Sequence, residues 1–352
     1  ASTMALIAET LGMMLPGTAA IPAVHAGRLR TAEETGELMA GMAMNGGPAP
    51  GELITRASVE NALRVLLAVS GSTNAVIHLA AVAGRLGLEV SLDRLNELSH
   101  DTPVLVDLKP VGAGYMEDFH AAGGLEGVLR GIAGKLDTTT RDITGQTLAE
   151  RLDKPLSDPI DRAYIRAPDN PVDEKGGLIA LRGSLAPDGA ILKRAAATPD
   201  LMEHEGRAVV FSSLEDLAAR IDDPDLDVSA DDVLVLQNSG PRSPSGMPEA
   251  GFLPIPKKLA RAGVKDMVRI SDARMSGTAF GTIVLHVTPE ADLGGPLALV
   301  QDGDRIRLSA SQRSVELLVS DDELLRRRAE FEPSSGSTPE RGYSKLYHEH
   351  VL

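Results

Sequence analysis

Residues 268–287 constrain the fold of this chain more than any other segment. Val268 and Ile270 lie in a short apolar run with β-branched residues, and residues 283–287 form a second such run. Both patterns predict β-strands, and the glycine- and hydroxyl-bearing segment between them predicts a loop. Because loops on rigid strands often carry chemistry, Ser276 in this loop is a candidate functional hydroxyl.

A second irregular segment, residues 238–251 (NSGPRSPSGMPEAG), lies upstream. It is rich in glycine, proline and serine, which predicts a loop, and it contains one carboxylate, Glu249. Together the two segments predict a site built from a loop carboxylate and a hydroxyl at a strand end. Glu249 alone is most simply a surface residue, because most glutamates are exposed.

The composition indicates a globular protein with two domains. The chain has 352 residues, of which 43% are hydrophobic and 24% charged. A net charge of -15 argues against nucleic-acid binding, although a bound cation could still recruit an anionic substrate. No apolar run is long enough to span a membrane and no signal peptide is recognised, so a cytoplasmic protein is expected. There is no cysteine, which excludes disulfides and thiolate ligands from these residues.

The pattern of apolar residues predicts an α/β chain in two parts. Residues 1–155 read as mostly helical with short strands, including a buried strand at 104–106, and Ser58 and Ser91 are predicted N-caps. Residues 156–176 are rich in proline and charge, which predicts a linker. In the β-rich part, 177–352, a hairpin-type turn is expected at 302–304. The predicted strands there are 178–181, 208–211, 233–236, 267–270, 282–287, 306–308 and 315–318, with helices at 213–221 and 255–262.

Several other polar residues admit both a functional and a structural interpretation. Residues 70–74 could bind an anion at a helix start, but helix capping is the favoured interpretation. His78 is interpreted as structural, whereas His120 could face a cleft. Asp272 and Arg274 could form a supporting pair around Ser276.

Separated motifs give this chain a resemblance to a known family. GPRSPSGMPE and SDARMSGTAFG resemble the dihydroxy-acid and sugar-acid dehydratases that use an iron–sulfur cluster and Mg²⁺. The resemblance runs along the chain in the same order, through ASTMALIAETLGMMLPGTAAIPA, SGSTNAVIHL, MEDFHAAGG, LRGSLAPDGAILK and RGYSKLYHEHV. The ARMSGTAFGT segment is closer to the sugar-acid branch (xylonate and arabinonate) than to the branched-chain enzyme.

The resemblance implies a role for each candidate. Glu249 would be a Mg²⁺ ligand, which suits the preference of Mg²⁺ for carboxylate oxygen. Ser276 would remove the C2 proton, which requires strong positive charge nearby because a serine hydroxyl is a weak acid. Thr278 would bind the substrate, although an ordinary loop threonine is an equal alternative. The family also implies a swivelling β/β/α domain at residues 177–352 and a homo-dimer or homo-tetramer.

The absence of cysteine conflicts with a cluster held by this chain alone. In the family the cluster cysteines lie upstream of the motif at Ala1–Met4, so the ligands of an expected [2Fe–2S] cluster lie outside this segment, which resembles the C-terminal portion of a longer protein. The expected activity is dehydration of a 2,3-dihydroxy sugar acid to a 2-keto-3-deoxy acid. The alternatives are a branched-chain dihydroxy-acid dehydratase and a non-catalytic fragment or binding module.

Overall fold

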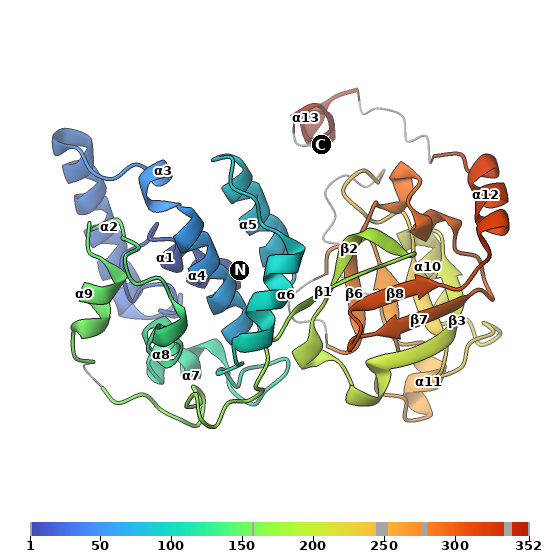
Figure 1. The fold of residues 1–352 in the computed structure, drawn as a ribbon, viewed down its shortest axis with the longest axis horizontal. Coiled ribbons are helices and arrows are strands. Elements are labelled where there is room, and N and C mark those ends of the chain that lie inside the picture. Colours follow the sequence, from blue (N-terminus) through green and yellow to red (C-terminus); the bar gives the residue numbers. More distant parts are fainter. Residues whose placement is uncertain (1, 157, 244–252, 276–279, 334–339, 351–352) are drawn as a thin grey trace. The chain divides into compact units, whose positions relative to one another are not determined.

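A computed structural model describes residues 2–156, 158–243, 253–275, 280–333 and 340–350 (Figure 1). Its contacts divide the chain into unit 1, which ends at Leu178, and unit 2, which begins at Ile179. Helices and strands are both present, which confirms the prediction of a mixed α/β chain. No helix within the described residues is long and apolar enough to cross a membrane.

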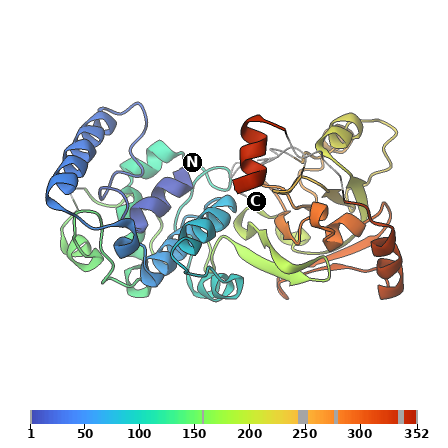
Figure 2. The same cartoon turned by 90° about the horizontal axis from the view of Figure 1, so that it is seen from above.

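Unit 1 is built from helices around one apolar core. The core contains Phe119, Leu105 and Val128, all fully buried. Helix α2 lies at the periphery of the unit in both views (Figures 1 and 2), and Gly27 is its one buried residue. The helices are α1 (Ser2–Thr10), α2 (Ala26–Asn45), α3 (Pro50–Leu53), α4 (Arg56–Ala68), α5 (Asn74–Gly84), α6 (Leu92–Asp101), α7 (Met116–Ala121), α8 (Gly124–Gly131) and α9 (Leu148–Asp153).

Helix caps follow the sequence closely, with one correction. Ser91 accepts a hydrogen bond from the Arg94 N–H and caps α6, as predicted. The N-cap of α4 is Thr55 rather than Ser58. The Ser58 hydroxyl instead accepts a hydrogen bond from the Thr55 N–H, so the two residues form a reciprocal capping box. The prediction was wrong because both hydroxyl residues stand near the helix start and only one can precede it.

Extended segments of unit 1 pair through single bridges. In the described part of this unit, Val104 pairs with Asp173 and Val106 with Ile165, rather than in a continuous sheet. The predicted strand at 104–106 is therefore buried and extended, but its partners come from residues 158–176. This segment, which was treated as a linker, contributes Ile165 to the core of unit 1.

Unit 2 is a closed barrel of eight strands. The strands are β1 (Ile179–Gly183), β2 (Ala186–Leu192), β3 (Glu203–Phe211), β4 (Val233–Leu236), β5 (Arg269–Ser271), β6 (Ile283–Thr288), β7 (Arg305–Ser309) and β8 (Ser314–Leu317). They follow one another around the barrel in the order β1-β2-β6-β5-β4-β3-β7-β8. Four neighbours, β3, β4, β5 and β6, are parallel, and their carboxyl ends therefore lie at one edge.

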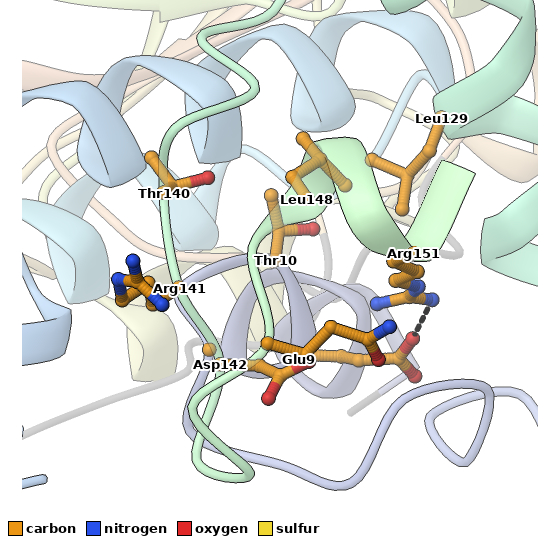
Figure 3. Close-up of a pocket in the computed structure, with 10 residues that line it drawn as sticks. Glu9, Thr10, Leu129, Thr140, Arg141, Asp142, Leu148 and Arg151 are labelled. Atoms are coloured by element: carbon orange, nitrogen blue, oxygen red, sulfur yellow. Dashed lines mark hydrogen bonds and ion pairs between the residues drawn. The ribbon is translucent and has the colours of Figure 1, made fainter. Parts of the chain in front are cut away.

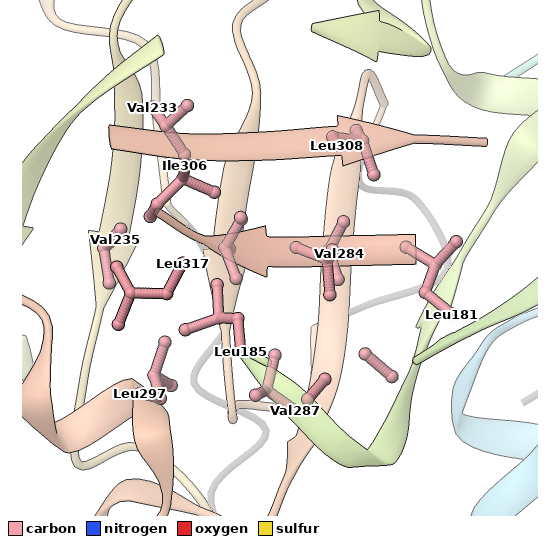
Figure 4. Packing of buried hydrophobic residues seen from close by; sticks show 14 of the residues in the cluster. Leu181, Leu185, Val233, Val235, Val284, Val287, Leu297, Ile306, Leu308 and Leu317 are labelled. Atoms are coloured by element: carbon pink, nitrogen blue, oxygen red, sulfur yellow. The ribbon is translucent and has the colours of Figure 1, made fainter. Parts of the chain in front are cut away.

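The parallel strands bury both faces, with alternate residues on each. Val233, Val235 and Val284 point into the barrel core (Figure 4), whereas Leu234 and Leu236 belong to a second cluster on the other face. That cluster includes Leu217 from α10 (Leu214–Arg220) and packs against Leu259 from α11 (Lys257–Arg261). Two buried faces explain why β4 is apolar at every position, as is typical of parallel strands.

The structure corrects two details of the predicted strands. Strand β2 was missed, because Pro187, Asp188 and Gly189 in its sequence are typical of turns. The turn at 302–304 precedes β7, whereas the hairpin that joins β7 to β8 turns at residues 310–313. Helices α12 (Asp321–Glu330) and α13 (Gly342–His350) follow the barrel strands.

Candidate functional site

The carboxyl edge of β3, β4, β5 and β6 is the first candidate site. Loops at this edge of parallel strands commonly hold ligands. Glu249 belongs to the segment that follows β4, and Ser276 and Thr278 belong to the segment that follows β5. These three predicted residues lie outside the described residues. The described strands nevertheless show that both segments begin at adjacent strand ends, because Leu236 is the register partner of Ser271.

Hydrogen bonds join the starts of these segments across the edge. The Asn238 side chain, after β4, donates from Nδ2 to the Ser212 carbonyl, after β3, at 3.0 Å. Asn238 adopts a left-handed backbone conformation with φ 51°, which asparagine tolerates better than most residues. The next residue, Ser239, donates its N–H to Asp272 Oδ1 at 3.1 Å. Hydrogen bonds therefore connect the starts of the loops that follow β3, β4 and β5.

Asp272 is the centre of this network. Its Oδ1 accepts from the Ser239 N–H and its Oδ2 accepts from the Ala291 N–H at 2.9 Å, so it connects the segments that follow β4 and β6. The residue is 2% exposed. Burial raises the pKa of Asp272 to about 6, while the backbone N–H groups act in the opposite direction. The contacts of Asp272 therefore reach backbone groups of both neighbouring segments.

Glu290 makes a second connection at the same edge. Its Oε2 accepts from the Arg242 N–H at 2.8 Å. A Cβ atom on Gly240 would lie 2.2 Å from the same oxygen, so the close approach requires glycine. Burial raises the pKa of Glu290, and the nearby charge of Asp272 acts in the same direction. Sequence reasoning missed Glu290, although its position directly after β6 would have indicated it once the strands were known to be parallel.

Backbone strain also occurs at this edge. His286 in β6 adopts φ 57°, an uncommon conformation for a residue other than glycine, and donates its N–H to the Ala273 carbonyl at 3.3 Å. Strained residues cluster at functional sites. Tyr347 of α13 is 3% exposed, and burial raises the pKa of its hydroxyl; the charge of Arg274 acts against this effect and that of Glu290 adds to it. Helix α13 therefore contributes a buried phenol near these loops.

Unit 1 contains a separate buried ion network. Arg151 of α9 donates to Glu9 of α1 at 2.5 Å and to Glu126 of α8 at 2.7 Å, and the Glu9 side chain has no exposed surface. Glu9 also accepts from the N–H groups of Gly17 and Ala19. The network borders a cavity of about 20 Å³, which is large enough for one water molecule (Figure 3). The described partners of the Glu9 side chain all belong to unit 1, which indicates a structural role for this carboxylate.

Other predicted polar positions of unit 1 have local partners. Ser72 Oγ accepts from the Asn74 N–H at the start of α5, which agrees with the capping interpretation of residues 70–74. His120 lies edge-on to His25, with ring centroids 5.8 Å apart. Burial lowers the pKa of His120, and the charges of His25 and Arg28 add to this effect. His78 is half-buried on α5.

The described residues contain no group of three His, Cys, Asp or Glu side chains that could hold a metal ion. The buried carboxylates of Asp272 and Glu290 are occupied by backbone N–H groups. Glu249, the predicted Mg²⁺ ligand, lies outside the described residues.

Comparison with family models identifies the relatives of this chain. Residues 1–151 match the model described as dihydroxy-acid/6-phosphogluconate dehydratase N-terminal, and residues 163–352 match the corresponding C-terminal model. The chain belongs to the dihydroxy-acid/6-phosphogluconate dehydratase family. The resemblance read from its motifs is therefore confirmed, and the boundary between the two matches falls within residues 152–162.

Curated relatives within this family include dehydratases of sugar acids. The chain is 47% identical to an L-arabonate dehydratase of Azospirillum brasilense over 99% of its own length. It is 46% identical to a 6-deoxy-6-sulfo-D-gluconate dehydratase of Pseudomonas putida over 100% of its length, and 40% identical to a dihydroxy-acid dehydratase of Methanococcoides burtonii over 95%. In each case the chain spans 60% of the length of the relative.

Proposed function

We propose that the protein to which this chain belongs dehydrates a 2,3-dihydroxy sugar acid. The observation that carries this proposal is the greater similarity to relatives named for sugar acids, 46–47% identity, than to the dihydroxy-acid dehydratase of Methanococcoides burtonii, 40%. The reaction removes a proton from C2 and hydroxide from C3, and the resulting enol tautomerises to a 2-keto-3-deoxy acid. A pentonate such as arabinonate is the proposed substrate.

Three residues of the two carboxyl-edge segments have proposed roles. Ser276 accepts the C2 proton, Thr278 donates a hydrogen bond to the substrate, and Glu249 ligates Mg²⁺. Adjacent parallel strands support this arrangement, because β4 and β5 direct the segments that carry Glu249 and Ser276 from the same edge. Bound Mg²⁺ would supply the positive charge that a serine hydroxyl needs in order to lose its proton.

The iron–sulfur cluster does not fit the residues of this chain. Clusters of this kind are held by thiolates, or by thiolates with histidine, and the chain has no cysteine. The proposed [2Fe–2S] cluster would therefore take its ligands from residues outside this segment.

The finer architecture and the assembly are also proposals. Unit 2 suits the family's swivelling domain in being a β-barrel with helices on its outer face. Unit 1, with its helical core, is proposed as the remaining part of an α/β domain. A homo-dimer or homo-tetramer and a cytoplasmic location remain predictions, and light scattering of the purified protein tests the first of these.

A substrate panel tests the proposed activity. The complete, metal-loaded protein is incubated with arabinonate, xylonate, gluconate and 2,3-dihydroxyisovalerate, and keto-acid formation is followed. The proposal expects the largest kcat/KM with a pentonate or hexonate. A larger value with dihydroxyisovalerate would assign the protein to the branched-chain activity, and no turnover of any of them would support the non-catalytic alternative.

A further inference from the structure

Asp272 connects three segments that begin at the carboxyl edge of the barrel. It lies directly after β5, accepts from Ser239 after β4, and accepts from Ala291 after β6. We propose that Asp272 is a positioning residue, which fixes the register of the three segments so that Ser276, four residues further on, meets its substrate in one geometry. The inference rests on the proposed function and extends it beyond Glu249, Ser276 and Thr278.

The two contacts of Asp272 require a carboxylate. Each oxygen accepts a separate backbone N–H, at 3.1 Å and 2.9 Å, so both sides of the group must be acceptors. Asparagine has the same shape but one acceptor, and its NH₂ group would face a backbone N–H as donor against donor. At a position that is 2% exposed, water does not compensate for the lost bond. Asp272→Asn therefore releases one neighbouring segment while leaving the volume of the side chain unchanged.

Glu290 supports the same arrangement from the other side. It lies beside Ala291, the Asp272 partner, and accepts from the Arg242 N–H after β4. Asp272 and Glu290 thus form two parallel cross-connections between the segments after β4 and β6. The Glu290 side chain has one described backbone donor, so the single amide oxygen of glutamine is enough to accept it. Glu290→Gln is accordingly a conservative change, whereas Glu290→Ala removes the connection.

A matched control lies at the opposite end of the same strands. Asp232 precedes β4, its side chain is 6% exposed, and it accepts from the Ser229 N–H at 2.8 Å. It also forms an ion pair with Arg207 of β3 at 2.9 Å. Asp232→Asn therefore disturbs a buried, multiply bonded aspartate of the same unit at the amino edge, and neither of these partners borders the segments that carry Glu249 and Ser276.

The experiment compares these variants in the complete, metal-loaded protein. For Asp272→Asn we expect kcat on a pentonate to fall about 100-fold with KM changed less than about threefold, because misplaced reacting groups mainly affect the chemical step. Hydrogen exchange at the Ser239 or Ala291 amide should become faster. Asp232→Asn should lower the melting temperature and speed exchange at the Ser229 amide while kcat stays within about twofold. Glu290→Gln should retain the activity that Glu290→Ala loses.

Two results would overturn the inference. One is an unchanged kcat in Asp272→Asn. The other is an equal loss of kcat in Asp232→Asn, which would show that any buried aspartate of the barrel has this effect through stability. If Asp272→Asn does not fold, the Glu290→Gln and Glu290→Ala pair decides, because equal activity of the two variants contradicts the cross-connection. Failure of the proposed function is distinguishable, since the wild-type protein would then form no keto acid.

Discussion

Replacing Arg151 with methionine should destabilise unit 1 more than removing any exposed cation. Methionine keeps much of the length of the side chain but leaves Glu9, which has no exposed surface, without its cationic partner. Breaking a buried ion pair costs about 3–5 kcal/mol. The N–H groups of Gly17 and Ala19 still hold the Glu9 carboxylate, so the lower value, about 3 kcal/mol, is expected. Over roughly 180 residues that corresponds to a decrease in melting temperature of about 6–12 °C.

Differential scanning calorimetry of three variants tests this magnitude. Arg94 pairs with Glu60 and Glu97, but its side chain is 45% exposed, so Arg94→Met should cost no more than about 1 kcal/mol. The double variant Glu9→Gln/Arg151→Met should recover part of the loss, because no uncompensated charge remains. Equal shifts for Arg151→Met and Arg94→Met would refute the reasoning.

Three further predictions concern unit 2. Burial raises the pKa of Asp272 from an ordinary 3.8 to about 6, so between these pH values the folded state binds a proton that the unfolded state has lost. The stability of the wild type relative to Asp272→Asn should therefore decline by about 3 kcal/mol as the pH rises through this window, as measured by urea unfolding. Lys193 is 9% exposed, burial lowers its pKa to about 8, and its ammonium group has no hydrogen bond or ion pair with the described residues. Lys193→Met should therefore raise the melting temperature at neutral pH, and a decrease would contradict this reasoning. Gly240→Ala should reduce kcat because the added Cβ displaces Glu290. Gly303 has open space around it but a left-handed backbone with φ 92°, so Gly303→Ala should lower stability and leave kcat unchanged.

The sequence predicted individual strands well because runs of apolar and β-branched residues are local signals. The expected bounds of β4, residues 233–236, agree with the structure, and those of β6 agree within one residue at each end. Strand β2 was not predicted, because Pro187, Asp188 and Gly189 favour turns and only pairing with β1 and β6 makes the segment a strand. Tertiary pairing of this kind is not encoded in a local pattern.

The site shows the same division between local and non-local information. Loop composition identified the segments that carry Glu249 and Ser276, and these positions remain predictions. Asp272 was noticed because it stands next to Ser276 in the sequence, but its partners, Ser239 and Ala291, are 33 and 19 residues away. Those partners, and the role of Glu290, depend on the parallel order of β4, β5 and β6, which the sequence did not reveal.

The most direct test is a single-turnover comparison of Ser276→Ala with the wild-type protein, both complete and metal-loaded, on C2-deuterated arabinonate. We predict keto-acid formation by the wild type with a primary isotope effect, and none by Ser276→Ala at equal metal content. Substantial keto-acid formation by the alanine variant would contradict it.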